Sequence, residues 1–341
     1  MSTSVVVVNW NGGDLLQDCL QSLVDDHGAP ETSGVEIVLV DNASTDGSVE
    51  RAQRSFPALR LVRRPTNEGF AAGANAGIRA SDGEFVVLVN NDAVVRRGFL
   101  RAITAPMAEP GGEDVAAVTG RVLLAGHYVP AAAGTPADAA LVARDGRRWA
   151  RVPGDGPGVR LLNSTGNVVT RSGNGGDRDW LAPADTAPAA AEVFGFNGGC
   201  VALRRRALDA VGLFDAGLFM YFEDTELSWR LRRGGWRIVH APQALTDHQH
   251  AASSGTATAF FEVHNARNRL VVAVAQAPWP VVARALLRTL VRLVLGPRRD
   301  RTARALAQAL GMIPAALARR RRTDRLSTVS RAEVARWLVP D

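Results

Sequence analysis

The sequence contains no lysine, and this absence excludes one common kind of phosphate site. All 40 basic residues of the 341 are arginine, and the formal net charge is +6. A Walker loop places a lysine in a glycine-rich turn, where it reaches the phosphates of a bound nucleotide. The chain therefore has no Walker-type nucleotide site.

Cysteines and long apolar runs are also scarce. Cys19 and Cys200 are the only cysteines, and two cysteines provide neither a disulfide framework nor a complete metal site. No apolar run reaches the roughly 20 residues that a membrane-spanning helix needs. No charged segment precedes the first apolar run, at residues 4–8, so we expect no signal peptide. These features predict a protein of a reducing compartment, the cytoplasm.

Short apolar runs alternate with helical segments in the first third of the chain. Predicted strands cover residues 4–8, 36–40, 59–62 and 85–89, and helices begin near Asp14, Ser48 and Asn67. This alternation predicts an α/β fold with a parallel sheet and right-handed crossovers. Later strands are predicted at 115–122, 161–170, 196–203 and 237–240, helices at 205–211 and from 223, an irregular segment at 125–157 and a loop at 172–180.

Polar residues follow three of the first four predicted strands: Asn9, Asp41 and the run Asn90-Asn91-Asp92. The carboxyl ends of parallel strands form the edge where open α/β sheets bind ligands. The first strand is followed by Asn9-Trp10-Asn11-Gly12-Gly13, which lacks the glycine fingerprint of dinucleotide-binding folds. The pattern therefore predicts a pocket of amides and carboxylates, in which Asp41 is well placed to accept hydrogen bonds from a base or ribose.

The segment from Ala71 to Gly77 consists of unusually small residues. Glycine lets a backbone approach a ligand closely, and it also allows a helix to pack tightly on a sheet. The sequence leaves both explanations open.

An apolar run from Leu218 to Phe222 leads directly into the acidic residues Glu223 and Asp224. Acidic residues favour a helix N-terminus for purely structural reasons. Two adjacent acids beside aromatic residues also suit a general base, because desolvation tunes their pKa. Further on, His248 and His250 are either surface residues or candidate metal ligands, and Asp92 is the carboxylate expected to join one of them.

The C-terminal region is basic and helical. Arg284, Arg288 and Arg292 are spaced four apart in an apolar helix predicted over 281–295, and a second helix, at about 303–317, is predicted to end at the arginines 319–322. Basic amphipathic helices suit an anionic membrane surface, although a helical pair packed on the main domain would also fit. No recognition motif or aromatic stacking surface indicates nucleic acid.

Taken in order, these motifs resemble the inverting glycosyltransferases of family two, which have the GT-A fold, and most of all the bacterial rhamnosyltransferase-like branch that builds cell-wall and surface polysaccharides. The matching segments are 8–11, 40–48, 67–70 with Asn75, 90–92, 197–199, 223–230 and 267–269. The resemblance covers about residues 4 to 270. It implies a GT-A domain at 1–270, with a mostly parallel sheet and flanking helices, and an Arg-rich helical region at 271–341.

The resemblance implies a nucleotide-sugar donor, a dTDP- or UDP-sugar. Asp41 would hold the base or ribose, helped by the backbone near Asn9. Asn90-Asn91-Asp92 occupies the position of the family's Asp-x-Asp motif, which binds the sugar diphosphate through Mg²⁺ or Mn²⁺, with Asp92 and His248 as metal ligands. An asparagine at position 90 removes one charge from that motif and weakens the expected metal affinity. The donor would also contact Asn67, Asn75 and Asn197.

The resemblance further implies that Asp224 or Glu223 is the catalytic base, with Asp224 favoured. The acceptor would be a glycan or a polyprenyl-linked sugar, and the protein would act peripherally at the inner face of the cell membrane. Two alternatives remain: a catalytically degenerate partner or membrane-binding subunit, suggested by Asn90, and a sugar-phosphate nucleotidyltransferase. The second needs a basic glycine-rich loop after the first strand, and residues 9–13 contain no basic residue.

Overall fold

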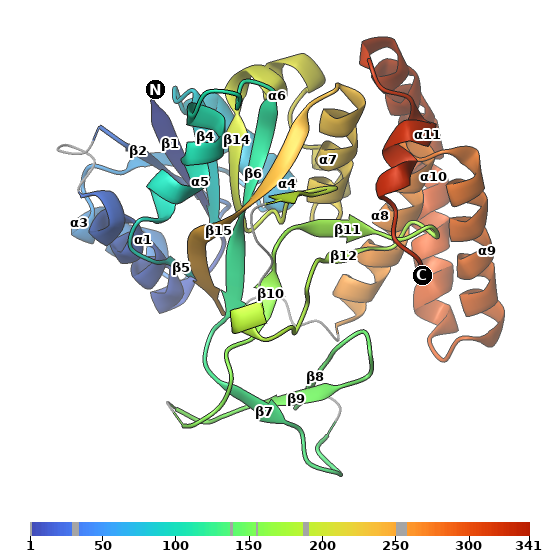
Figure 1. Cartoon of the computed structure of the whole chain (residues 1–341), viewed down its shortest axis with the longest axis horizontal. Coiled ribbons are helices and arrows are strands. Elements are labelled where there is room, and N and C mark those ends of the chain that lie inside the picture. Colours follow the sequence, from blue (N-terminus) through green and yellow to red (C-terminus); the bar gives the residue numbers. More distant parts are fainter. Residues whose placement is uncertain (1, 29–33, 137–138, 155, 187–190, 250–257) are drawn as a thin grey trace.

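The structure is a computed structural model, which describes all residues except 1, 29–33, 137–138, 155, 187–190 and 250–257. A central sheet carries helices on both faces, a small sheet extends beyond one of its ends, and a group of C-terminal helices lies at its side (Figure 1). This arrangement places the polar strand ends near the small sheet rather than on an open surface.

The central sheet has the strand order β13-β15-β6-β14-β4-β1-β2-β3, with β5 paired to β15 and β10 to β6. Its first half is parallel, as predicted, whereas β14 runs antiparallel to both of its neighbours. The bounds are β1 Thr3–Asn9, β2 Glu36–Asp41, β3 Arg60–Arg63, β4 Phe85–Asn90, β5 Ala93–Val95, β6 Val115–Leu124, β10 Leu162–Ser164, β13 Ala191–Glu192, β14 Cys200–Arg204 and β15 Arg237–His248.

Strand β4 is a continuous apolar run because both of its faces are buried. Phe85, Val87 and Val89 join the core on one face, and Val86 and Leu88 join the core on the other. A strand buried on both faces has no polar position until it ends. The main-domain helices that cover these faces are α1 Gly13–His27, α3 Ser48–Ser55, α4 Gly69–Ala80, α5 Phe99–Ala108, α6 Arg205–Val211 and α7 Glu223–Arg233.

The small residues of α4 serve helix–sheet packing. A Cβ atom on Gly77 would lie 2.2 Å from Cγ1 of Val6, and one on Gly73 would lie 2.6 Å from Cγ1 of Val8. These separations are far below ordinary carbon contacts of about 3.5–4.0 Å. Of the two explanations left open by the sequence, tight packing therefore accounts for these glycines.

Regions predicted to be irregular contain ordered β structure. Within 125–157, strands β7 Tyr128–Pro130, β8 Leu141–Val142 and β9 Arg148–Arg151 form a small sheet in the order β7-β9-β8. Strand β11 Asn167–Val169 lies within the strand predicted at 161–170, and it forms a hairpin with β12 Gly175–Asp177, where a loop was predicted. The sequence hides the small sheet and β12 because their strands are only two to four residues long, too short to show an alternating pattern.

Strand β15 is longer than predicted and ends at His248. The register of its pairing with β6 shifts between His240 and Leu245, around Pro242, which has no backbone N–H to donate to a ladder. The apolar pattern that predicts the strand therefore stops at residue 240, although the strand resumes pairing with β6 at Leu245.

The C-terminal helices share one core with the main domain. They are α8 Ala259–Gln276, α9 Trp279–Leu295, α10 Arg299–Leu326 and α11 Arg331–Val334. Residues of α8, α9 and α10 pack with Phe194 and Trp229, and residue 270, the predicted domain boundary, lies inside α8. None of the described helices has the length and hydropathy needed to cross a membrane.

Helix α9 forms as predicted, whereas the predicted end of α10 at residues 319–322 is wrong. Arginine is a good helix former, and Arg320 donates to the carbonyl oxygens of Val274 and Ala277, at 2.9 and 2.7 Å. The arginine run is thus fixed on α8 and continues the helix instead of ending it.

Candidate active site

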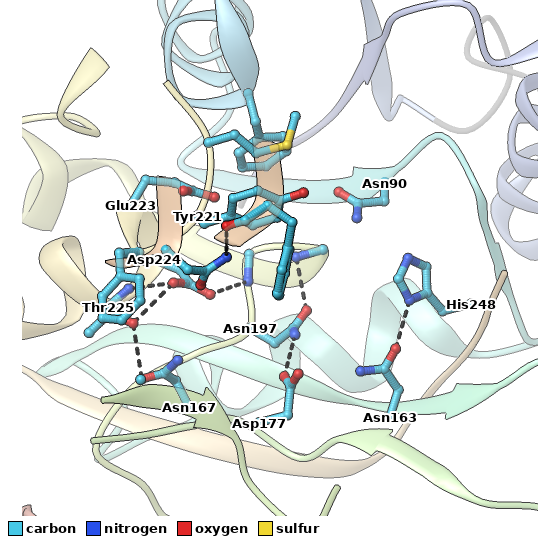
Figure 2. Close-up of a pocket in the computed structure, with 18 of the residues that line it drawn as sticks. Asn90, Asn163, Asn167, Asp177, Asn197, Tyr221, Glu223, Asp224, Thr225 and His248 are labelled. Atoms are coloured by element: carbon cyan, nitrogen blue, oxygen red, sulfur yellow. Dashed lines mark hydrogen bonds between the residues drawn. The ribbon is translucent and has the colours of Figure 1, made fainter. Parts of the chain in front are cut away.

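A cavity of about 600 Å³ opens at the carboxyl ends of the first strands. Eight predicted site residues line it, namely Asn67, Asn90, Asn91, Asp92, Asn197, Glu223, Asp224 and His248. Figure 2 shows Asn90 and His248 on one side of the cavity and Glu223 and Asp224 on the other, with Asn197 between them. Residues from β4, β15 and α7, far apart in sequence, thus face one space.

Three predicted site residues do not line the cavity: Asn9, Asp41 and Asn75. Each of them holds a neighbouring segment in place. Asn9 accepts from Asn91 Nδ2 at 2.7 Å and donates to two serine hydroxyls. Asp41 accepts from the backbone N–H of Ser44 at 2.8 Å and pairs with Arg63 at 3.2 Å. These contacts hold the loop after β2 and the turn after β4.

Asn75 is buried beneath the segment that leads to α7. It donates to the carbonyl oxygen of Phe214 at 2.9 Å and accepts from the N–H of the same residue at 3.0 Å. Both hydrogen bonds are internal to the protein, so Asn75 contributes to the cavity through the segment that it positions.

Asp92 and His248 form the pair to which the sequence assigned metal binding. Nε2 of His248 lies 3.0 Å from Oδ1 of Asp92, and Nδ1 lies 2.7 Å from Oδ1 of Asn163. A hydrogen bond of this kind on the far ring nitrogen orients a histidine ligand. Burial lowers the pKa of His248, but the hydrogen bond and charge of Asp92 outweigh it and raise the pKa overall.

These two donors fit a divalent cation that is shared with a substrate. Two neighbouring ligands of an octahedral Mg²⁺, with bonds of about 2.1 Å, lie about 3 Å apart. The described residues contain no cluster of three or more His, Cys, Asp or Glu that could hold an ion by themselves. Mg²⁺ is commonly held by one or two protein ligands together with substrate phosphates, and the pair matches that arrangement.

The two carboxylates at the start of α7 differ in their hydrogen bonding. Asp224 accepts from the N–H of Thr225 at 2.6 Å and from the N–H of Gly198 at 3.2 Å. Both donors stabilise the ionised form. Oε2 of Glu223 is buried and has no hydrogen-bond partner among the described residues.

Burial raises the pKa of both carboxyl groups. For Glu223 the second cause is the negative charge of Asp224. For Asp224 the charge of Asp177 adds to burial, while the N–H donors of Thr225 and Gly198 oppose the rise in pKa. Asp224 therefore ionises more readily than Glu223 and is the better candidate for a general base.

The loop before α7 is strained and held by α8. Phe219, Tyr221 and Phe222 have φ angles of 67°, 70° and 69°, which cost bulky residues free energy. Nδ2 of Asn268 lies 3.0, 2.9 and 2.7 Å from the carbonyl oxygens of Leu218, Met220 and Tyr221. The motif at 267–269 thus fixes the backbone that presents Glu223 and Asp224.

Several residues that line the cavity were not predicted from the sequence. They include Asn42, Arg144, Asn163, Asn167, Asp177 and Trp180. Asp177 is half-buried, accepts from Asn197 Nδ2 at 2.8 Å, and has its pKa raised by desolvation. Asn42 could have been predicted as a site residue, because it follows Asp41 at the end of a strand. The other residues lie in segments that were predicted to be irregular, a strand or a loop, where no pattern marks a site.

Comparison with known proteins identifies the family. The family model described as "Glycosyltransferase like family 2" matches residues 2–273. An N-acetylglucosaminyl-diphospho-decaprenol L-rhamnosyltransferase of Mycobacterium tuberculosis is 31% identical over 270 residues, which cover 74% of this chain and 77% of the relative.

Solved structures agree on the fold. GalNAc-T7, determined with UDP, GalNAc and Mn²⁺, is 16% identical with a TM-score of 0.61, and the match covers 92% of this chain and 57% of that one. S. aureus TarS in complex with UDP-GlcNAc is 17% identical with a TM-score of 0.52, covering 96% and 84%. Both are GT-A glycosyltransferases, so the predicted fold is confirmed. Because the family model spans most of its length, the chain belongs to glycosyltransferase family 2 and is a glycosyltransferase.

Proposed function

We propose that the protein transfers a sugar, with rhamnose as the candidate, from a dTDP- or UDP-sugar to a hydroxyl of a glycan or polyprenyl-linked acceptor in cell-wall or surface polysaccharide synthesis. The observation that carries this proposal is the placement of Asp224 across one cavity from Asp92 and His248. A base and a diphosphate site on opposite sides suit in-line displacement with inversion. The name of the mycobacterial relative, a rhamnosyltransferase with a lipid-linked acceptor, supports this choice of substrates.

Separate residues act on the acceptor and on the leaving group. Asp224 takes the proton of the acceptor hydroxyl while that oxygen attacks the anomeric carbon and the bond to the nucleoside diphosphate breaks. Asp92 and His248 would hold Mg²⁺ or Mn²⁺, which neutralises charge on the leaving diphosphate when bound. Asp224 is half-buried, and desolvation raises the pKa of its carboxyl group, which makes the carboxylate more basic. A degenerate, non-catalytic subunit is not favoured, because both α7 carboxylates face the cavity.

Activity can be tested with dTDP-rhamnose or UDP-sugars, Mn²⁺ and an N-acetylglucosaminyl diphosphate carrying a short polyprenyl chain. We expect the wild type to form product and Asp224→Asn to lose at least about 100-fold in kcat, since general bases contribute about 10²–10⁴-fold. The variant should still gain thermal stability from the donor, because ligands that bind the folded state raise its melting point. A wild type that binds donors but transfers to neither glycan nor lipid-linked acceptors would contradict the proposal.

The outer face of α9 supports peripheral binding to the cytoplasmic face of the cell membrane. Val281, Val282 and Ala285 of this helix are buried, whereas its other face exposes the large apolar residues Leu286, Leu287, Leu290, Val291, Val294 and Leu295. The helix lies on the outer side of the C-terminal helices (Figure 1). Arg284 and Arg292 are exposed on the same helix and complement anionic headgroups.

Flotation with anionic vesicles tests this surface. Leu287→Glu with Val294→Glu should abolish flotation, because these side chains are 62% and 60% exposed on α9. Val129→Glu with Val142→Glu is the matched control, since these valines are exposed on the small sheet. Equal flotation of the α9 variant and the control would refute the membrane proposal.

A further inference from the structure

The described residues that line the cavity carry an excess of negative charge. Asp92, Asp177, Glu223 and Asp224 face it, and the basic side chains are Arg144 and His248. A nucleotide sugar adds a diphosphate, and a lipid-linked acceptor of the proposed kind adds another. One cation site at Asp92 and His248 offsets the first, so the second needs its own positive group.

Arg144 is fixed in place by the small sheet. It lies in the turn between β8 and β9, where the N–H of Ala143 donates to the carbonyl oxygen of Arg147 at 2.8 Å. Ala143 is buried in the core of this sheet beside Tyr128 and Trp149. The backbone that carries Arg144 is therefore anchored although its side chain is exposed.

The guanidinium group of Arg144 lies across the β11–β12 hairpin. Its Nη2 atom is 2.9 Å from the position that a Cβ atom on Gly176 would occupy, so glycine at this position leaves room for it. Among the described residues, no hydrogen bond or salt bridge is formed by Arg144. By contrast, Arg147 in the same turn pairs with Asp145 at 2.6 Å.

The position of Arg144 corresponds to the acceptor side of the cavity. In an inverting transfer the acceptor enters from the face opposite the leaving diphosphate, which is the side of the base. The hairpin packs against that base: Oγ1 of Thr225, next to Asp224, donates to Oδ1 of Asn167 in β11 at 3.2 Å. Arg144 lies over β12 of the same hairpin, where its charge acts on Asp177. Asn42 and Asn67, which follow β2 and β3, line the cavity from the parallel half of the sheet.

We propose that Arg144 binds a phosphate of the acceptor, the diphosphate that joins its first sugar to a polyprenyl chain. Arginine presents a planar pair of donors that matches phosphate oxygens. This inference rests on the proposed function. In it, the acceptor diphosphate is recognised by a residue of the small sheet rather than by the central sheet of the GT-A fold. The donor diphosphate does not use this residue.

Binding measurements on the full chain test the inference independently of turnover. Isothermal titration would compare the wild type, Arg144→Gln and the control Arg147→Gln. The probes are N-acetylglucosaminyl diphosphate on a short polyprenyl chain, an alkyl N-acetylglucosaminide without phosphate, and dTDP-rhamnose with Mn²⁺. We expect Arg144→Gln to weaken binding of the first probe by about 10- to 100-fold, the range for a hydrogen bond to a charged group, and to leave the other two unchanged.

The outcomes separate this inference from the proposed function. Equal affinity of Arg144→Gln and Arg147→Gln for the diphosphate acceptor would overturn the inference even if the enzyme transfers sugar. Weaker binding of dTDP-rhamnose by Arg144→Gln would overturn it in favour of a donor contact. Arg144-dependent acceptor binding without sugar transfer would preserve the inference and contradict the proposed function. Circular dichroism of both variants excludes misfolding as the cause.

Discussion

The side-chain amide nitrogen of Asn268 lies 2.7 Å from the carbonyl oxygen of Tyr221, two residues before Glu223. The same amide reaches the carbonyl oxygens of Leu218 and Met220. A single amide of α8 therefore lies within hydrogen-bonding distance of three carbonyl oxygens in a loop whose backbone is strained at Phe219, Tyr221 and Phe222. The geometry of the two carboxylates proposed for catalysis therefore depends on a helix that packs beside the central sheet.

Asn268→Asp tests this dependence, because aspartate keeps the size of the side chain but has no N–H to donate. We expect kcat/KM to fall by at least about 10-fold, and unfolding free energy to fall by about 1–3 kcal/mol from the unsatisfied carbonyl groups. Steady-state kinetics well below the melting temperature, together with chemical denaturation, measure both. Gln308→Glu, an isosteric change in an exposed residue of α10, is the control, and equal behaviour of the two variants would contradict the prediction.

The charge of Asp177 should set the acid side of the pH profile. Burial and this charge raise the pKa of Asp224, and a base must be ionised to act, so kcat/KM falls as the pH drops through that raised pKa. Asp177→Asn removes the charge and keeps an oxygen to accept from Asn197. The acid limb should therefore move to lower pH, as a pH profile would show. An unchanged limb would mean that Asp177 is neutral or that Asp224 is not the base.

Glu223 should destabilise the fold at high pH. Burial and the charge of Asp224 raise its pKa above the unfolded value of about 4.3. Its neutral form is favoured in the folded state, so stability is fully present below the unfolded pKa and falls as the pH rises through the folded pKa. Glu223→Gln should therefore raise the melting temperature at pH 8.5 and have little effect at pH 4. Calorimetry, with the exposed Asp209→Asn as the control, measures this; equal gains at both pH values would refute it.

Packing of α4 on the sheet predicts opposite effects for two glycine substitutions. A Cβ on Gly77 would meet Cγ1 of Val6 at 2.2 Å, whereas one on Gly311, in α10, meets nothing within 4 Å. Gly77→Ala should destabilise by about 1–3 kcal/mol through overpacking. Gly311→Ala should stabilise by about 0.5–1 kcal/mol, because alanine favours a helix. Urea denaturation measures both, and a neutral Gly77→Ala would show that α4 can shift freely.

Metal dependence should respond to the charge at position 90. Asn90→Asp adds a carboxylate to the motif that ends at Asp92, and affinity for hard cations increases with the charge of their ligands. We expect the Mn²⁺ concentration for half-maximal activity to fall by several-fold, and chelation to abolish activity in both proteins. A titration of activity against free Mn²⁺ checks this. An unchanged half-maximal Mn²⁺ concentration would contradict the prediction.

The sequence predicted the elements whose signals are local and missed those that depend on tertiary pairing. Strand β4 was predictable because both faces are buried, and the polar residues after it follow directly. Asp177 and Asn163 were not predicted as site residues. Asn163 lies within the strand predicted at 161–170, a pattern that does not show which residues reach a cavity, and β12, Gly175–Asp177, gains its structure by pairing with β11. The end of β15 at His248 was hidden by the register shift. Arg144 could not be distinguished from the other arginines without the turn that anchors it.

If the exposed apolar face of α9 binds the membrane as proposed, it also changes how the reaction must be measured. A protein held on a bilayer by this face meets a lipid-linked acceptor by diffusion in two dimensions. The relevant concentration of acceptor is then its mole fraction in the surface, and adding inert lipid or detergent lowers the rate without any change in the bulk concentration. Apparent KM values quoted in molar units would differ between laboratories that use different micelles, whereas values expressed per surface area would agree.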